Sequence, residues 1–345
     1  PSSSADSTVS SARSSGSSRS GSWPTAARAR RSPFELGGEQ VRSGRKRRLE
    51  LPIAKLVSGT QVSLPVLVLH GVAPGPTVWV SAALHGDEVG GVEIIRRVLE
   101  HLDPKELSGT LIAVPVINVY GFNTGDRYLP DRRDLNRSFP GSPRGSLAGR
   151  IANLLMTEVV SRCSIGIDLH TGSDNRVNLP QVRGDLDDAA TVELARVFGA
   201  PLALHSRLRD GSLRQAATDE GATVLLFEGG EALRFDQEAI RVGVGGVLRV
   251  LHHVGVTDEV TPPGDQPVVS PKSHWVRATR SGIAGLDVEL GDVVAKGDTV
   301  ATVHDPFGKR LGRVNARRSG MVIGHTQLPL VNRGDALVHV ADLPD

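Results

Sequence analysis

Residues 77–88 read TVWVSAALHGDE, a largely apolar run that ends in a histidine, a glycine and two acids. A run of this kind predicts a strand covered on both faces, as in the parallel sheets of α/β proteins. Gly86 then allows a tight turn, and apolar residues repeat with helical spacing from residue 94 to residue 102. The segment therefore predicts a strand, a turn and a helix, with polar side chains at the carboxyl end of the strand, where sites collect.

Three other apolar runs, at 110–119, 164–170 and 222–228, have the same character. A second apolar stripe with helical spacing runs from Leu147 to Val159. This alternation predicts an α/β fold with a mixed, mostly parallel sheet flanked by helices. We expect this domain to span residues 46–262.

The two ends of the chain differ from this pattern. Residues 1–45 are expected to form a disordered tail, because the first part is rich in serine and arginine and lacks apolar periodicity. Its composition is also that of organellar transit peptides, so the tail is either a targeting peptide or dispensable.

Beyond residue 262 the sequence predicts only short strands and Gly-Asp turns, and GDTVATVHD at 297–305 recurs as GDALVHVAD at 334–342. Residues 263–345 are therefore expected to form a small all-β barrel with two related halves.

Composition excludes several classes of protein. The 40 basic and 38 acidic side chains give a net charge of +2. This near balance does not show the excess of basic residues that is typical of a nucleic-acid-binding protein. No apolar run approaches the roughly 18 residues that cross a bilayer, so no membrane partner is expected. The single cysteine, Cys163, cannot form an internal disulfide, and a cytoplasmic protein with a buried thiol is the simplest expectation. The sequence leaves the oligomeric state open, a homo-oligomer included.

Possible metal ligands gather where the predicted strands end. His85 and Glu88 are separated by a glycine turn that can bring both onto one ion, and His170 ends another strand. Two histidines, one glutamate and an open position form a recurring catalytic zinc site. Asp168, two residues before His170, either orients a ligand from outside or caps a local turn.

Two further features suit catalysis. The loop from Arg127 to Gly141 concentrates arginine, whose planar guanidinium matches a carboxylate; the alternative is a solvated charged loop. Glu228 ends the apolar run at 222–228. Burial of a carboxylate there costs free energy, so the residue is expected to have either a catalytic role or a charged partner. A general base and a salt bridge are the two alternatives.

Five motifs in a fixed order resemble the succinylglutamate desuccinylase and aspartoacylase family, which is related to the zinc carboxypeptidases. They are HGDE at 85–88, NVYGF at 118–122, DLNRSFPG at 134–141, DLHTG at 168–172 and the strand that ends in Glu228. The resemblance implies a zinc carboxypeptidase-like fold, with one zinc ion per chain bound by His85, Glu88 and His170. It also implies that Glu228 is the catalytic carboxylate.

The resemblance assigns the arginine-rich loop to the substrate. Asn136 and Arg137 are expected to bind its carboxylate. Arg127 fits the arginine that polarises the scissile carbonyl, with Arg132 and Arg133 as competitors. Further along, NLPQVRG carries side chains that either face the substrate or form a turn; they are Asn178, Gln181 and Arg183.

These expectations imply a zinc-dependent amidohydrolase that removes the acyl group from an N-acyl amino acid or a related small carboxylate-bearing amide. The alternatives are a metallocarboxypeptidase acting on short peptides and a non-catalytic binding module. Residues 263–345 are similar to the lipoyl-like barrel at the end of some family members. Lys309 lacks the preceding acid that lipoylation needs, so we expect this part to be a packing or oligomerisation surface.

Overall fold

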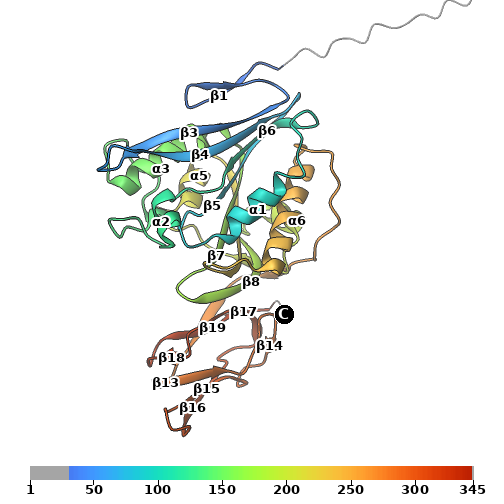
Figure 1. The fold of residues 1–345 in the computed structure, drawn as a ribbon. Coiled ribbons are helices and arrows are strands. Elements are labelled where there is room, and N and C mark those ends of the chain that lie inside the picture. Colours follow the sequence, from blue (N-terminus) through green and yellow to red (C-terminus); the bar gives the residue numbers. More distant parts are fainter. Residues whose placement is uncertain (1–30, 344–345) are drawn as a thin grey trace, which may run out of the picture. The chain divides into compact units, whose positions relative to one another are not determined.

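A computed structural model describes residues 31–343 of the chain (Figure 1). The strands are β1 (Phe34–Leu36), β2 (Glu39–Val41), β3 (Arg45–Lys55), β4 (Gln61–His70), β5 (Ala73–Ala82), β6 (Ser108–Val114), β7 (Ile165–Gly172), β8 (Arg176–Gly184), β9 (Leu202–His205), β10 (Thr223–Glu231), β11 (Val268–Ser270), β12 (Ser273–Arg277), β13 (Gly282–Leu286), β14 (Val293–Val294), β15 (Thr299–His304), β16 (Arg310–Asn315), β17 (Gly320–Thr326), β18 (Leu330–Val331) and β19 (Ala336–Ala341). The helices are α1 (Gly90–Val98), α2 (Val119–Thr124), α3 (Leu147–Glu158), α4 (Ala189–Phe198), α5 (Leu213–Asp219) and α6 (Gln237–His253). Across the described part of the chain, none of the helices has the length and apolar character that a membrane crossing requires.

A mixed sheet forms the centre of the molecule. Its main path in the described residues is β12-β19-β17-β8-β10-β7-β5-β6-β4-β3, with β9, β11 and β14 paired at its side. The strands β6, β5, β7 and β10 are parallel, and antiparallel pairs continue the sheet on both sides. The predicted α/β class with a mixed sheet flanked by helices is confirmed, and most of its parallel pairing lies in the central strands.

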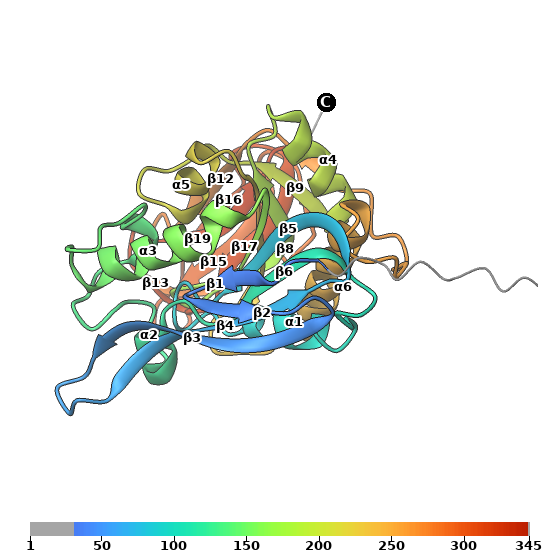
Figure 2. The same cartoon turned by 90° about the horizontal axis from the view of Figure 1, so that it is seen from above.

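Alternate residues of the central strands pack on opposite faces of the sheet, as the pleat requires. Val78 and Val80 of β5 share a buried core with α1, α4 and α6, whereas Trp79 between them shares a core with α3 and α5. Figures 1 and 2 show α3 and α5 on one side of β5 and α1 and α6 on the other. A layer of helices therefore covers each face, which leaves the ends of the parallel strands as the place for a site.

The strand expected over 110–119 is shorter than predicted. β6 ends at Val114, and α2 begins at Val119. Pro115 cannot donate to a strand ladder, and the side chain of Asn118 accepts a hydrogen bond in the first turn of α2. Apolar composition alone does not reveal this helix start.

The N-terminal segment also differs from the prediction. Residues 1–30 lie outside the described residues. Residues 34–41 form the hairpin β1-β2, and β3 begins at Arg45. Leu36 and Val41 are almost completely buried in the core beneath α3. The disorder predicted for residues 34–45 is therefore wrong, because apolar side chains there complete the core.

The described residues after 262 contain strands and no helix, as the sequence predicted. The two copies of the repeat contain β15 and β19, which pair antiparallel with β13 and β17, respectively. β17 also pairs with β8, and β11 with β9, so the central sheet continues into this part of the chain. The described residues pack as one compact unit, and a separate domain over 263–345 stays a prediction.

Candidate active site

Three parallel strands end at the same edge of the sheet and present the predicted site residues. β5 leads into the turn that holds His85 and Glu88. His170 of β7 lies opposite Glu228 of β10 in the strand register. Ligand sites collect at this edge of α/β sheets because the side chains of several strand ends meet there.

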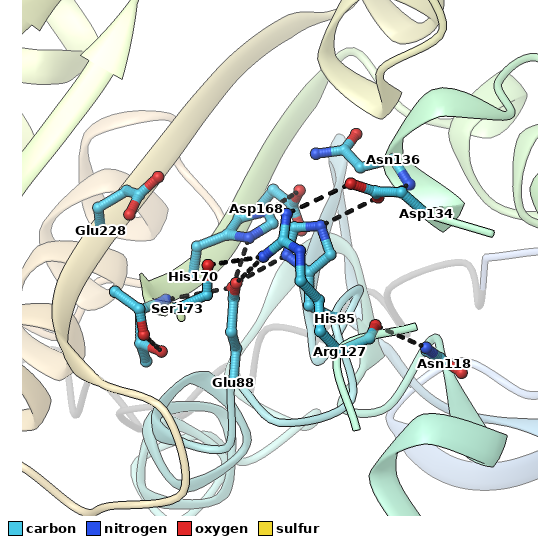
Figure 3. A network of polar contacts seen from close by, with 12 residues as sticks. His85, Glu88, Asn118, Arg127, Asp134, Asn136, Asp168, His170, Ser173 and Glu228 are labelled. Carbon is cyan, nitrogen blue, oxygen red and sulfur yellow. Dashed lines mark hydrogen bonds and ion pairs between the residues drawn. The ribbon is translucent and has the colours of Figure 1, made fainter. Parts of the chain in front are cut away.

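His85, Glu88 and His170 converge around one point (Figure 3). Each offers a ligand atom, and these atoms lie within 4.8 Å of one another. Both imidazoles direct Nδ1 at the carboxylate: His85 Nδ1 lies 2.7 Å from Glu88 Oε1, and His170 Nδ1 lies 2.7 Å from Glu88 Oε2. All three side chains are buried, so water competes little for these atoms.

The charge state of this group suits a metal. Burial acts to raise the pKa of Glu88, but the adjacent His85 and His170 hold that pKa well below its usual range. The carboxylate therefore stays ionised in the interior. Two imidazole nitrogens and one ionised carboxylate are a donor set that catalytic zinc sites use, so these residues fit such an ion.

An aspartate contacts the outer nitrogen of His170. His170 Nε2 lies 2.8 Å from Asp168 Oδ2, and Asp168 Oδ1 accepts a hydrogen bond from Ser81 Oγ at 2.8 Å. A carboxylate in this position fixes the orientation of the ring and directs the other nitrogen inward. Of the two alternatives for Asp168, the geometry supports orientation of His170.

His85 has an equivalent partner that the sequence did not reveal. His85 Nε2 lies 3.2 Å from Asp134 Oδ1, which also accepts a hydrogen bond from the backbone N–H of Asn136. Asp134 stands in the DLNR segment, but nothing in the sequence connects residue 134 with residue 85. Only the folded loop brings the two together.

Arg127 is the one of the three competing arginines that lines the site. Its NH1 donates to Glu88 Oε1 at 3.0 Å and to Ser173 Oγ at 2.8 Å. Arg132 and Arg133 point toward solvent, with 76% and 60% of their side chains exposed. The geometry therefore favours Arg127 for contact with a substrate.

Asn136 and Arg137 lie at the wall of the same cavity. The amide oxygen of Asn136 accepts a hydrogen bond from the backbone N–H of Leu213 at 2.9 Å. This contact orients the side chain and leaves its NH2 group for a ligand. Both residues are therefore placed to bind an anionic group.

Glu228 reaches the cavity from β10. Its Oε2 accepts a hydrogen bond from Asn178 Nδ2 at 2.6 Å, and its Oε1 lies 3.4 Å from Arg183 NH1. Gln181 differs, because it is fully buried and donates to the backbone oxygen of Ile323. Of the three β8 residues singled out in the sequence, Asn178 and Arg183 line the cavity and Gln181 does not.

The cavity has a volume of about 350 Å³ and is rich in arginine. Its arginines are Arg127, Arg137, Arg176, Arg183, Arg207, Arg209 and Arg214. Trp275 and His339 of the C-terminal strands also line it, with stacked rings whose centroids lie 4.5 Å apart. The expectation of a packing or oligomerisation surface for residues 263–345 did not include these two rings, which pairing of β17 with β8 brings to the site.

The similarity to known proteins places the chain among the hydrolases that remove acyl groups. Residues 74–254 match the succinylglutamate desuccinylase/aspartoacylase catalytic domain. The chain belongs to this family, as its motifs predicted.

Relatives cover most of the chain. N-alpha-acetyl-L-2,4-diaminobutyric acid deacetylase from Halomonas elongata is 29% identical over 310 residues, which are 86% of this chain and 90% of the relative. The crystal structure of a succinylglutamate desuccinylase/aspartoacylase from Rhodobacter sphaeroides is 28% identical with a TM-score of 0.77, over 87% of this chain and 96% of the other. The product-bound ectoine utilization protein EutE (DoeB) from Ruegeria pomeroyi shares the fold, with a TM-score of 0.79 and 24% identity over 91% of this chain and 100% of the other.

Proposed function

We propose that the chain is a zinc-dependent amidohydrolase that removes the acyl group from an N-acyl amino acid or a related small carboxylate-bearing amide. One observation carries the proposal: a buried histidine-glutamate-histidine group opens into a cavity that arginines line. The first feature suits activation of water, and the second suits an anionic amide.

The metal site and Glu228 would share the attack on the amide. His85, Glu88 and His170 would hold the zinc ion, which would lower the pKa of a water molecule. Glu228 would accept a proton from the water that attacks the carbonyl carbon and return it to the nitrogen of the departing amine. The contacts of Glu228 with Asn178 and Arg183 keep its carboxylate oriented for the first of these steps.

The arginine-rich loop would place the substrate. Arg127 donates to the carbonyl oxygen as negative charge develops there, a contact of the type worth about 3 to 4 kcal/mol for one donor. Asn136 and Arg137 hold the carboxylate of the amino acid, so that the scissile bond lies beside the metal site. Arg127 itself is oriented by its hydrogen bonds to Glu88 and Ser173.

One comparison and the structure of the cavity support this choice over the alternatives. The relative from Halomonas elongata is named for deacetylation of an N-acetylated amino acid. The cavity of about 350 Å³ suits a small molecule, so the carboxypeptidase alternative is limited to short peptides, and substrate choice separates the two. A non-catalytic binding module would not need a buried ligand set together with a candidate base.

Incubation of the zinc-loaded protein with N-acetyl and N-succinyl amino acids and with dipeptides tests the proposal. We expect release of free amino acid from the N-acyl substrates, and a loss of about 100-fold or more in kcat for Glu228→Gln. Glu238→Gln, an exposed carboxylate on α6, is the matched control and should keep full activity. Hydrolysis of dipeptides alone would favour the carboxypeptidase, and Glu228→Gln activity equal to that of the control would exclude Glu228 as the base.

A further inference from the structure

Three polar contacts hold the guanidinium of Arg127 at the site (Figure 3). Its NH1 donates to Glu88 Oε1 at 3.0 Å and to Ser173 Oγ at 2.8 Å, and its NH2 donates to Asp134 Oδ2 at 3.3 Å. Glu88 belongs to the proposed ligand set, and Asp134 contacts His85 of that set. Ser173 differs, since no hydrogen bond joins it to a ligand residue in the described part of the chain.

A bound metal would weaken the contact between Arg127 and Glu88. The ion would draw on the same carboxylate and repel the guanidinium, because both carry positive charge. The hydroxyl of Ser173 is uncharged and keeps its lone pairs for the arginine. Ser173 is therefore the partner of NH1 that does not depend on whether the site is loaded.

A turn between β7 and β8 fixes the place of Ser173. The backbone N–H of Arg176 donates to the carbonyl oxygen of Ser173 at 3.2 Å, which closes a four-residue turn. Both central residues, Asp174 and Asn175, have positive φ, of 55° and 57°. Asp and Asn adopt this left-handed conformation more readily than other residues that carry a side chain. The local sequence therefore suits the turn that directs the hydroxyl at Arg127.

The C-terminal strand β17 holds this turn from the other side. β17 pairs antiparallel with β8, with Thr326 opposite Arg176. One residue further along, the backbone N–H of Gln327 donates to the carbonyl oxygen of Asn175 at 2.7 Å. The pairing thus continues past the start of β8 and into the turn that carries Ser173.

We infer that Ser173 is a positioning residue that keeps Arg127 at the carbonyl of the substrate, and that the pairing of β17 with β8 fixes Ser173 through the turn. The inference rests on the proposed function for the role of Arg127 and on the hydrogen bonds for its position. Ser173 acts through Arg127 and takes no part in the bond that breaks.

Crystal structures of the zinc-loaded protein test the position without catalysis. In the wild type, Ser173 Oγ should lie within about 3.2 Å of Arg127 NH1. In Ser173→Ala, the guanidinium of Arg127 should shift by about 1 Å or more, a displacement large enough to impair catalysis. A zinc-loaded wild type without the hydrogen bond to Ser173, or an unmoved guanidinium in Ser173→Ala, would overturn the inference.

Kinetics test whether this position matters for the reaction. Ser173→Ala should lower kcat about tenfold, as expected for loss of one hydrogen bond to a charged group, and should change KM less than about twofold. Ser173→Thr keeps the hydroxyl and should have a kcat within about twofold of the wild type. Ser161→Ala, an exposed serine that donates to the backbone of Thr157, is the matched control and should keep full activity. A kcat for Ser173→Ala equal to that of the control, or no recovery in Ser173→Thr, would contradict the positioning role.

Two pairs of variants test the turn and its link to β17. Asn175→Val places a β-branched residue at positive φ, whereas Asn175→Gly adopts this conformation freely. Gln327→Pro removes the N–H that donates to Asn175, whereas Gln327→Ala keeps it. The first variant of each pair should have a kcat about threefold or more below the second, because Arg127 is misplaced. Equal kcat values within both pairs, with unchanged circular dichroism, would show that β17 does not fix Ser173.

Failure of the inference differs in its results from failure of the proposed function. If the wild type hydrolyses N-acyl amino acids and Ser173→Ala retains the kcat of its control, the proposed function stands and the inference fails. If no N-acyl amino acid is hydrolysed, the proposed function fails. The zinc-loaded crystal structures then still decide whether Ser173 holds Arg127.

Discussion

Gly324 of β17 lies directly against Asn178 of β8, so that a Cβ at residue 324 would stand 2.8 Å from Asn178 Oδ1. Asn178 in turn donates to Glu228 at 2.6 Å. The C-terminal strands therefore help to set the position of the candidate base, through a residue that must have no side chain.

Gly324→Ala should lower activity more than stability. The added methyl group displaces the Asn178 side chain, and Glu228 loses a hydrogen bond that orients it. We expect kcat to fall roughly tenfold, about 1.4 kcal/mol, with little change in Tm. Gly285→Ala on β13 is the control, because a Cβ there meets no atom within 4 Å and the backbone is not left-handed. Equal kcat values for the two variants would show that Asn178 does not position Glu228.

Asp168→Asn should weaken metal binding. The substitution replaces the carboxylate that contacts His170 Nε2 with an amide of similar shape. Loss of such an outer carboxylate typically costs 10-fold to 100-fold in metal affinity. Competition with a chromogenic chelator measures this directly. Ser81→Ala is the control, because it removes only the hydrogen bond from Ser81 to the other oxygen of Asp168, and its zinc affinity should change less than threefold. Equal zinc affinities of Asp168→Asn and Ser81→Ala would contradict the account.

His339 should make the folded state sensitive to acid. Burial, and then the nearby charges of Arg183, His274 and Arg176, lower the pKa of His339 to about 3. In the unfolded chain its pKa is about 6.5, so between these values only the unfolded state binds the proton. The free energy of unfolding therefore falls as the pH falls below about 6.5, by up to about 1.4 kcal/mol per pH unit, and is unaffected by this group above that pH.

Urea unfolding of His339→Gln between about pH 5 and pH 7 tests this dependence. The variant should show a smaller slope of stability against pH than the wild type. His253→Gln, at an exposed position at the end of α6, should keep the wild-type slope. A slope for His339→Gln equal to that of the wild type would mean that His339 is not buried in its neutral form.

Gly166→Ala should destabilise the fold itself. A Cβ at Gly166 of β7 would stand 2.0 Å from Cζ2 of Trp79, which is fully buried on the neighbouring strand β5. Neither the strand nor the ring can move without disturbing the core, so we expect a loss of about 1 to 3 kcal/mol in the free energy of unfolding. Urea titration measures it, and a loss under 0.5 kcal/mol, as roughly expected of an exposed substitution, would contradict this packing.

The sequence predicted the residues at the strand ends better than the residues that surround them. His85, His170 and Glu228 follow buried apolar runs, and parallel strands place such positions at one edge of the sheet. The helix start at Val119 was missed because its signals, Pro115 and the capping Asn118, lie inside an apolar run. Local patterns therefore predicted the centre of the site and the class of the fold.

Partners from distant parts of the chain could not be predicted in this way. Asp134 reaches His85 through the path of an irregular loop, which no periodicity describes. Trp275 and His339 reach the cavity only because β17 pairs with β8 in a particular register. The burial of Arg214 in α5 is likewise a property of packing, which its local sequence does not indicate.

Metal content tests the central claim most directly. Purified wild-type protein, loaded with zinc and dialysed, should contain about one zinc ion per chain by mass spectrometry. His170→Ala and Glu88→Gln should each retain less than a tenth of that amount, while His274→Ala, on β12, should retain all of it. Wild-type protein without bound zinc after this treatment, or full zinc content in His170→Ala, would contradict the account.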